Sequence, residues 1–218
     1  MRSRMQYFRV GLLVPAALAA LLLFSAPAQA DFIFSLEPGI TAAAGSTGNF
    51  FDVLLTNTGG SAVTVGGFSF GITTADTDIT FTNADTSTTA PYVFTGDSFD
   101  DMNGFTLYTN SLPGQTVEAA DFSNSGSGES VGAGATVGVG RIMFDIANGA
   151  TPGPFAVTFE NSPTTSLSDN NGGNLDFTAT PGTITITSGT TVPEPAQGGL
   201  MICALAGFAI LVQRRRRA

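Results

Sequence analysis

Hydrophobic and polar residues alternate in short runs along most of the chain, and this period of two predicts β-strands. Between residues 31 and 191, no run keeps the helical period of 3.6 for more than about two turns. Glycine, asparagine, aspartate and proline separate the runs, as turn formers do between strands. The predicted strands, about ten in number, are Phe32–Leu36, Phe50–Thr56, Ala62–Thr73, Ile79–Thr82, Tyr92–Phe94, Phe105–Thr109, Val117–Ser123, Val137–Ile146, Phe155–Phe159 and Thr183–Thr187.

This many short strands predict an all-β domain over residues 31–190, built as a two-layer antiparallel β-sandwich. Phenylalanine is the dominant large side chain, with 18 in the sequence, and most are at positions expected to face the core. In the run Ala62–Thr73 the apolar positions change from odd to even numbers. A β-bulge at Gly66–Gly67 is the expected cause, because one extra residue returns the following side chains to the inner face.

The first 30 residues have the three parts of a secretory signal peptide. Three arginines lie within the first nine residues, and an uncharged apolar run follows over residues 10–24. Ala28 and Ala30 then occupy the small-residue positions of a cleavage site just before Asp31. We therefore expect signal peptidase to remove residues 1–30 and the chain to be exported; an uncleaved N-terminal anchor is the alternative.

A second apolar segment lies near the C-terminus, over residues 196–212. At about 1.5 Å per residue, such a helix is about 25 Å long, slightly short of a hydrocarbon core of about 30 Å. The segment stands between Val192, Pro193, Glu194 and Pro195 on one side and Arg214, Arg215, Arg216 and Arg217 on the other. The positive-inside preference would hold the arginines in the cytoplasm, so the residues alone are compatible with a simple tail anchor.

The proline-glutamate-proline motif, the short apolar helix and the basic tail together closely resemble the PEP-CTERM sorting signal of bacterial envelope proteins. The resemblance covers residues 191–218 and implies that an exosortase, a membrane-embedded transpeptidase-like enzyme, recognises Glu194 and its flanking prolines. Proline disfavours helix at the residue before it, which keeps this motif extended at the membrane face. The resemblance implies transient anchoring in the inner membrane, followed by routing to the envelope, the cell surface or the extracellular matrix.

The strand sequence of the central domain is similar to that of cohesin-like and carbohydrate-binding-module-like sandwiches. The segments that carry this resemblance are Asn49–Asn57, Val63–Ile72, Val137–Ile146, Ser166–Asp169 and Gly182–Ile186. It implies a jelly-roll β-sandwich that binds dockerin partners, sugars or calcium, or that spaces other modules.

Composition removes several classes of function. The sequence has no histidine, lysine or tryptophan, and its single cysteine is Cys203. Histidine-based catalysis, cysteine-rich zinc sites, lysine Schiff bases and intrachain disulfides are therefore excluded. Of the 17 acidic residues, 16 lie between residues 31 and 192, where Arg141 is the only basic residue. Such a surface repels phosphate, so we expect no nucleic-acid partner.

A loop dense in oxygen ligands is the candidate metal site. Asp169, Asn171 and Asp176 lie in it, and hard cations such as Ca²⁺ take about six to eight oxygen ligands. The spacing does not fit the EF-hand, and the same residues are common turn formers. We therefore expect no cofactor, with calcium at this loop as the alternative.

A second acidic group is a candidate for glycoside hydrolysis, which uses paired carboxylates. It consists of Asp97, Asp100 and Asp101, with Asp76 and Asp78 earlier in the chain. These residues lie in polar turn contexts, so solvated loop acids are the preferred interpretation, and we expect no enzyme activity.

Four aromatic residues and one arginine complete the candidates. Tyr92, Tyr108, Phe99 and Phe105 could form a platform on which sugars stack, although aromatics in a sandwich more often lie in the core. Arg141, within a predicted strand, is expected to pair with a neighbouring acid or to lie at a sheet edge.

Taken together, the sequence predicts a non-catalytic exported protein that is sorted by exosortase. We expect it to be a structural or adhesive component of the cell envelope or of an exopolysaccharide matrix. The alternative is a carbohydrate- or calcium-binding cohesin-like module, and a hydrolase ranks last. The expected partners are signal peptidase, exosortase, the inner membrane and exopolysaccharide.

Overall fold

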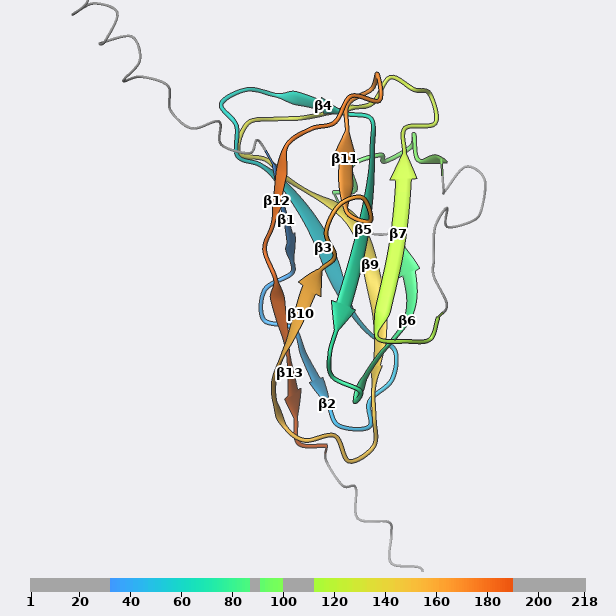
Figure 1. Ribbon diagram of the computed structural model, residues 1–218, viewed down its shortest axis with the longest axis vertical. Coiled ribbons are helices and arrows are strands. Elements are labelled where there is room, and N and C mark those ends of the chain that lie inside the picture. Colours follow the sequence, from blue (N-terminus) through green and yellow to red (C-terminus); the bar gives the residue numbers. More distant parts are fainter. Residues whose placement is uncertain (1–31, 87–90, 100–111, 190–218) are drawn as a thin grey trace, which may run out of the picture.

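A computed structural model describes residues 32–86, 91–99 and 112–189 of the chain (Figure 1). Their strands are β1 (Phe32–Leu36), β2 (Thr41–Ala43), β3 (Asn49–Asn57), β4 (Val63–Val65), β5 (Gly67–Thr74), β6 (Ile79–Asp85), β7 (Thr116–Phe122), β8 (Glu129–Val131), β9 (Thr136–Ile146), β10 (Gly153–Phe159), β11 (Ser166–Ser168), β12 (Phe177–Ala179) and β13 (Gly182–Thr187). The prediction of an all-β fold is confirmed for this part of the chain. Within it, no helix has the length and apolar character needed to cross a bilayer. The predicted signal and membrane helices lie outside the described residues.

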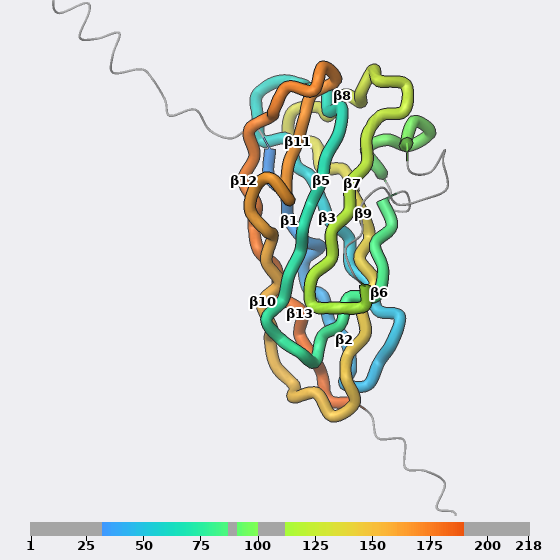
Figure 2. Tube along the Cα trace, turned by 45° about the vertical axis from the view of Figure 1, so that its right-hand side comes forward, coloured from blue at the N-terminus to red at the C-terminus, as the bar shows by residue number. Residues whose placement is uncertain are grey.

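Two sheets form the layers of the sandwich, as Figure 2 shows from an oblique direction. The five-stranded sheet has the order β12-β1-β3-β9-β6, and the six-stranded sheet has the order β11-β5-β10-β13-β2 with β7 paired to β5. A separate two-stranded ribbon, β4-β8, lies at one end of the sandwich. The predicted two-layer sandwich is therefore confirmed.

Most neighbouring strands are antiparallel, but two pairs are parallel, and for these the antiparallel prediction was wrong. β1 pairs with β12 in one sheet, and β2 pairs with β13 in the other. The chain passes from the five-stranded to the six-stranded sheet twice, once between β1 and β2 and once between β12 and β13. Because the two crossings run side by side in the same direction, both pairs that they form are parallel. Backbone bonds from Thr180 to Phe34 and from Thr185 to Ile40 hold them together.

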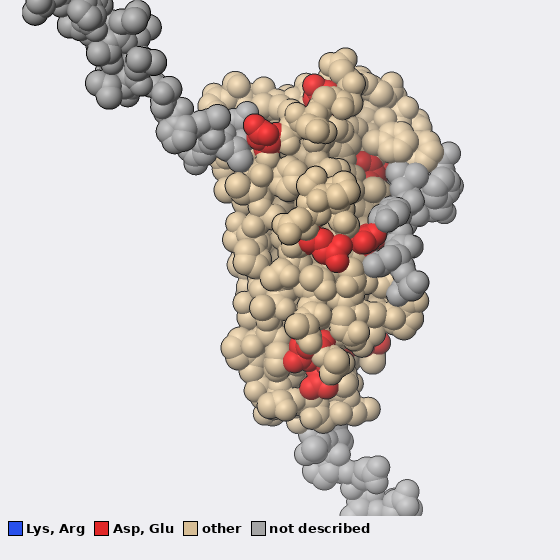
Figure 3. Space-filling model, viewed as in Figure 1, with Lys and Arg blue, Asp and Glu red and all other residues tan. Residues whose placement is uncertain are grey.

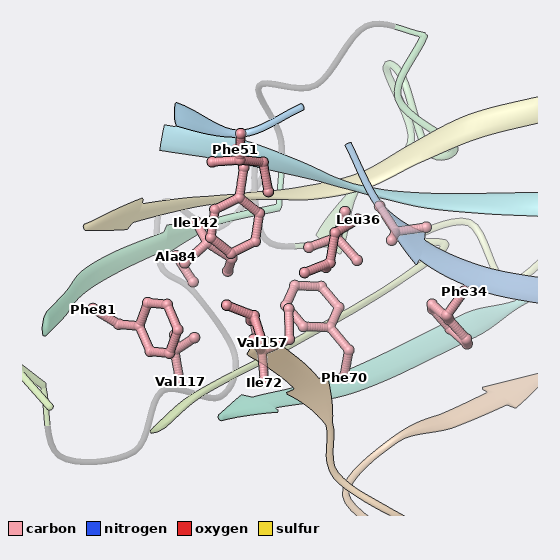
Figure 4. Close-up of a cluster of buried hydrophobic side chains, with 14 of the residues drawn as sticks. Phe34, Leu36, Phe51, Phe70, Ile72, Phe81, Ala84, Val117, Ile142 and Val157 are labelled. Atoms are coloured by element: carbon pink, nitrogen blue, oxygen red, sulfur yellow. The ribbon is translucent and has the colours of Figure 1, made fainter. Parts of the chain in front are cut away.

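The core is the space between the sheets, and phenylalanine fills most of it. On β3 the side chains of Phe51, Val53 and Leu55 are fully buried, as period-two alternation requires. Phe51 packs against Phe81 and Phe144 with ring centroids 6.3 and 5.7 Å apart. Figure 4 shows Phe51 and Phe81 in the same buried cluster as Phe70 and Ile72 of the opposite layer. Burying each such side chain contributes about 1.5–3 kcal/mol, which explains why the domain needs no disulfide.

The predicted continuous strand over Ala62–Thr73 is wrong, because the chain changes sheet there. β4 ends at Val65 and pairs with β8, whereas β5 begins at Gly67 in the six-stranded sheet. Between them, a Cβ added to Gly66 would lie 2.3 Å from the Asp169 carbonyl oxygen, so a side chain is not tolerated. The apolar positions change parity because two strands meet. The register irregularities lie elsewhere, between β3 and β9 at Val53/Leu54 and between β6 and β9 at Phe81/Asn83.

Further differences concern short segments. Tyr92–Phe94 forms a turn in which only Tyr92 bridges to β9, at Gly138, so the predicted strand is wrong. The three-residue strands β2, β8, β11 and β12 were not predicted, since three residues carry too little alternation to detect. The predicted strand Phe105–Thr109 lies outside the described residues.

Candidate functional site

All residues of the predicted sorting signals lie outside the described part of the chain. These are Ala28 and Ala30 of the cleavage site, Val192, Pro193, Glu194 and Pro195 of the motif, and Arg214, Arg215, Arg216 and Arg217 of the tail. The same is true of Asp100, Asp101, Phe105 and Tyr108. Their roles stay predictions.

The candidate calcium loop is organised by Asp169 itself. Its Oδ1 accepts hydrogen bonds from the backbone N–H groups of Asn171 and Gly173, each 2.8 Å long. Asp176 lies further along the loop and is exposed. No group of three or more potential metal-ligating His, Cys, Asp or Glu residues occurs in the described ranges. The loop thus has the geometry of a turn held by an aspartate, and calcium binding at Asp169, Asn171 and Asp176 stays a prediction.

The candidate hydrolytic acids that the structure describes are occupied in turns. Asp76 accepts a hydrogen bond from the backbone N–H of Asp78, two residues later, at 2.8 Å. Asp97 accepts bonds from the Ser123 hydroxyl at 2.5 Å and from the backbone N–H of Ser125 at 2.9 Å. The Ser123 bond is the main cause that lowers the pKa of Asp97. A low pKa suits a carboxylate that anchors a turn, and it is the opposite of what a general acid requires.

A buried carboxylate that sequence reasoning missed lies on β7. Asp121 is 1% exposed and faces the interior. It accepts hydrogen bonds from the Tyr92 hydroxyl, from the Ser98 hydroxyl at 2.6 Å and from the backbone N–H of Phe122 at 2.8 Å. Burial, followed by the bond to Asp121, raises the pKa of Tyr92 far above its usual value, so the phenol stays a donor.

This cluster ties the segment 91–99 to β7, and it places Tyr92 in the core. Tyr92 is 6% exposed, so it is not part of a sugar-stacking platform. Phe99 stacks on Phe122 with ring centroids 4.4 Å apart. The sequence contained a signal for Asp121, because period-two alternation over Val117–Ser123 places position 121 on the inner face with the apolar positions 117 and 119.

Arg141 lies on β9, directly opposite Asp52 on β3. Its Nε donates to Asp52 Oδ1 at 2.7 Å and its Nη2 donates to Oδ2 at 3.0 Å, so the pair is bidentate. The hydrogen bond to Asp52 is the main cause that raises the pKa of Arg141, and the charges of Glu37 and Asp85 add to it. The prediction that Arg141 pairs with a neighbouring acid is confirmed.

Phe50 lies beside this ion pair. The ring centroid is 4.1 Å from the Arg141 guanidinium carbon, within cation–π range. Phe50 is 52% exposed and Phe122 is 41% exposed, and they are the large hydrophobic side chains most open to solvent among the described residues. We define the Phe50–Arg141 surface as Glu37, Phe50, Asp52, Asp85, Arg141 and Met143, on the outer face of the five-stranded sheet.

The outer face of the six-stranded sheet has a different character along β5. Gly67, Ser69 and Gly71 alternate there with the inward phenylalanines, so small residues line its centre. A Cβ added at Gly71 would lie 2.5 Å from Thr164 Cγ2 and 2.8 Å from Glu160 Oε2, so neighbouring side chains cover this glycine. Figure 3 shows small groups of acids and no basic residue among the described residues on the side of the molecule that it draws.

Glu118 on β7 lies opposite Gly71 on β5. Its Oε2 atom is buried and has no hydrogen-bond partner in the described structure.

A hollow of about 420 Å³ lies at the end of the sandwich where β2 and β13 finish. It is lined by Ala44, Asn148, Gly149, Ala150, Pro152, Ser188 and Gly189, which supply no acid, base or nucleophile for catalysis beyond one serine hydroxyl.

The sequence matches no protein-family model and no curated protein sequence. Solved structures, however, share the fold. The protein CaCohA2 of Clostridium acetobutylicum, solved in a complex with CaDoc0917, superposes with a TM-score of 0.56 at 17% identity, over 72% of this chain and 99% of that one. The sixth cohesin of scaffoldin B from Acetivibrio cellulolyticus, in complex with a Cel5 dockerin, has a TM-score of 0.53 at 14% identity, over 72% and 99%.

The third ScaB cohesin of R. flavefaciens, in complex with a group 1 dockerin, has a TM-score of 0.51 at 19% identity and covers 73% of this chain and 97% of its own. At these identities the likeness concerns the fold. The chain therefore contains a cohesin-like β-sandwich, in agreement with the resemblance found in the strand sequence.

Proposed function

We propose that this protein is a non-catalytic, exported protein-binding module. The observation that carries the proposal is the match of its body to almost the full length of cohesins that were solved in complexes with dockerins. The acids that were candidates for hydrolysis support a module without chemistry of its own, since Asp76 and Asp97 hold turns.

In the same proposal, residues 1–30 direct export and are removed, and exosortase processes the chain at Val192–Pro195. The protein then carries its binding module into the envelope or the exopolysaccharide matrix, in an adhesive or structural role. The carboxylate excess suits an exported module, since it keeps the domain soluble and prevents it from adhering to the anionic membrane.

Isolation of the tagged full chain from the envelope of the producing cell tests the binding function. We expect a protein to co-purify and the complex to re-form from the two purified proteins with saturable, stoichiometric heat in calorimetry. Neutral and anionic oligosaccharides, titrated in parallel, should give none. Saturable glycan binding without a protein partner would contradict the proposal.

Mass spectrometry of the mature protein tests the sorting. We expect a C-terminus near Glu194 and loss of the four terminal arginines, and a Glu194→Ala variant should keep its full tail. An intact Arg214–Arg217 tail on the mature wild-type protein would instead make this end a plain membrane anchor.

A further inference from the structure

The Phe50–Arg141 surface consists of two adjacent rows of side chains across neighbouring strands. In the first row Asp52 on β3 and Asp85 on β6 lie on either side of Arg141 on β9. In the second row Phe50 lies opposite Met143, which in turn lies opposite Asn83. Side chains two residues apart on a strand are separated by about 7 Å, so the apolar row lies within side-chain reach of the charged row.

The charged row has an excess of carboxylates. Glu37 extends it beyond β3, where its Oε2 accepts the backbone N–H of Asp52 at 3.2 Å. Three carboxylates, those of Asp52, Glu37 and Asp85, act on the charge of Arg141. The surface therefore keeps a negative potential although it contains the one arginine of the described residues.

The charge of the body decides which occupants fit. The described residues contain thirteen acidic side chains against one basic side chain. Like charge repels a second copy of this protein, and it also repels anionic polysaccharide and lipid. Charge complementarity favours a cationic partner.

The surface is also held in place before anything binds. The bidentate bond to Asp52 fixes the guanidinium, and Phe50 lies on it, so an exposed aromatic ring is kept in one position. Groups that are ordered in advance lose little entropy on association. Aromatic and arginine side chains are enriched among the residues that dominate binding energy at protein interfaces.

We propose that the Phe50–Arg141 surface docks a cationic segment of a partner protein. An apolar side chain of the partner covers Phe50 and Met143, and its lysine or arginine side chains lie opposite Glu37 and Asp85. This inference rests on the proposed function for the existence of a protein partner, and it adds the surface and the chemistry of the segment.

A peptide titration tests it directly. The full chain, labelled with ¹⁵N in a non-ionic detergent, is titrated with a synthetic peptide of alternating leucine and lysine, and separately with its leucine–glutamate counterpart. We expect the lysine peptide to shift amide signals around Phe50, Asp52, Asp85, Arg141 and Met143, and the glutamate peptide to shift none of them.

Matched variants then separate the two faces. Phe50→Ala should weaken binding of the lysine peptide at least about fivefold, since it removes the aromatic anchor. Phe122→Ala removes the exposed phenylalanine of the other sheet and should leave the affinity unchanged. Both side chains are open to solvent, so both variants should fold, which unchanged spectra away from each site would verify.

Several results would overturn the inference. They are shifts spread evenly over the acidic residues of the body, a larger loss from Phe122→Ala than from Phe50→Ala, dimerisation through Phe50, or binding of a neutral oligosaccharide at these residues. If the protein partner isolated from the envelope still binds Phe50→Ala at full strength, the proposed function stands, but the inference that the partner docks on the Phe50–Arg141 surface is wrong. If no protein partner binds the wild-type chain, the proposed function itself fails.

Discussion

The two sheets of the sandwich treat polar groups in different ways. On the five-stranded sheet an ion pair, Arg141–Asp52, lies partly exposed beside an open phenylalanine. On the inner side of the six-stranded sheet, the carboxylate of Asp121 is buried and accepts hydrogen bonds from hydroxyl and amide donors. The outer side of that sheet carries glycine and serine, and side chains cover Gly71.

The difference distinguishes polar groups that stabilise the fold from polar groups that a partner can reach. Hydrogen bonds inside the fold satisfy Asp121, so its loss should be felt as a loss of stability. The Arg141–Asp52 pair is at the surface, where ion pairs contribute little to stability, yet it orders groups that a partner can reach. We therefore expect substitutions near β5 and β7 to change folding, and substitutions near Phe50 to change binding.

The largest expected effect is that of Asp121→Ala. It removes the carboxylate that accepts from the buried Tyr92 and Ser98 hydroxyls and from the partly buried N–H of Phe122, which should cost about 3 kcal/mol of unfolding free energy. Asp52→Ala, the same change on the other sheet, should cost about 1 kcal/mol or less. Urea unfolding of both variants measures the two losses of stability. Equal losses would contradict the distinction between the buried Asp121 and the partly exposed Asp52.

Gly71→Val should have the next largest effect. Its Cβ would come within 2.5 Å of Thr164 and 2.8 Å of Glu160, so the variant should lose about 2 kcal/mol through overpacking. Thr56→Val on the outer face of the other sheet is the control, and it should change stability by about 0.5 kcal/mol or less. A tolerated valine at position 71 would show that the β5 face is open after all.

A small gain is expected from Glu118→Gln. The Oε2 atom of Glu118 is buried without a partner, so replacing the carboxylate by a neutral amide of the same shape should stabilise the fold by about 0.5–1 kcal/mol. Glu37→Gln on the Phe50–Arg141 surface should give no gain, because Glu37 lies near a positive charge. The comparison needs only thermal midpoints of the two variants.

The smallest effect concerns pH and the Asp97 carboxylate. Its pKa is lowered, chiefly by the Ser123 hydroxyl and also by bonds from Ser125, while desolvation opposes them. A carboxylate whose pKa is lowered by folding stabilises the fold fully when the pH is above its unfolded pKa of about 3.9. This contribution disappears as the pH falls through the lower pKa of the folded state. Ser123→Ala should therefore lessen the dependence of stability on pH in the acidic range, with little further change in a Ser123→Ala/Asp97→Asn double variant. An unchanged acid unfolding curve for Ser123→Ala would contradict this assignment.

The layers of the fold could be predicted from the sequence because alternation reports which side chains are buried. Phe51, Val53 and Leu55 alternate with Phe50, Asp52 and Leu54, so the pattern also indicates that Phe50 is the outward member of the Phe50–Phe51 pair. The change of sheet at Gly66 could not be predicted, since it appears only once distant segments meet: Gly66 lies against the backbone of Asp169, which is far away in the chain.

The candidate surface was less accessible to prediction. Arg141 was expected to find an acid, but its partner depends on the register between β3 and β9, which the sequence does not specify. Asp121 was not singled out among the acids, although its place in the alternation of β7 indicates that it is buried. The candidate calcium and hydrolytic residues were chosen because acids and asparagines lie close together in the sequence, and such clustering is also typical of turns.

Hydroxyl-radical labelling compares the two faces most directly in the protein's own setting. The full chain is oxidised once after purification and once in the intact envelope of the producing cell, and labelling of Phe50 and Met143 is compared with labelling of Phe122. We predict that Phe50 and Met143 are labelled severalfold less in the envelope, while Phe122 is labelled equally in both. Protection of Phe122 with unchanged labelling of Phe50 would contradict the account.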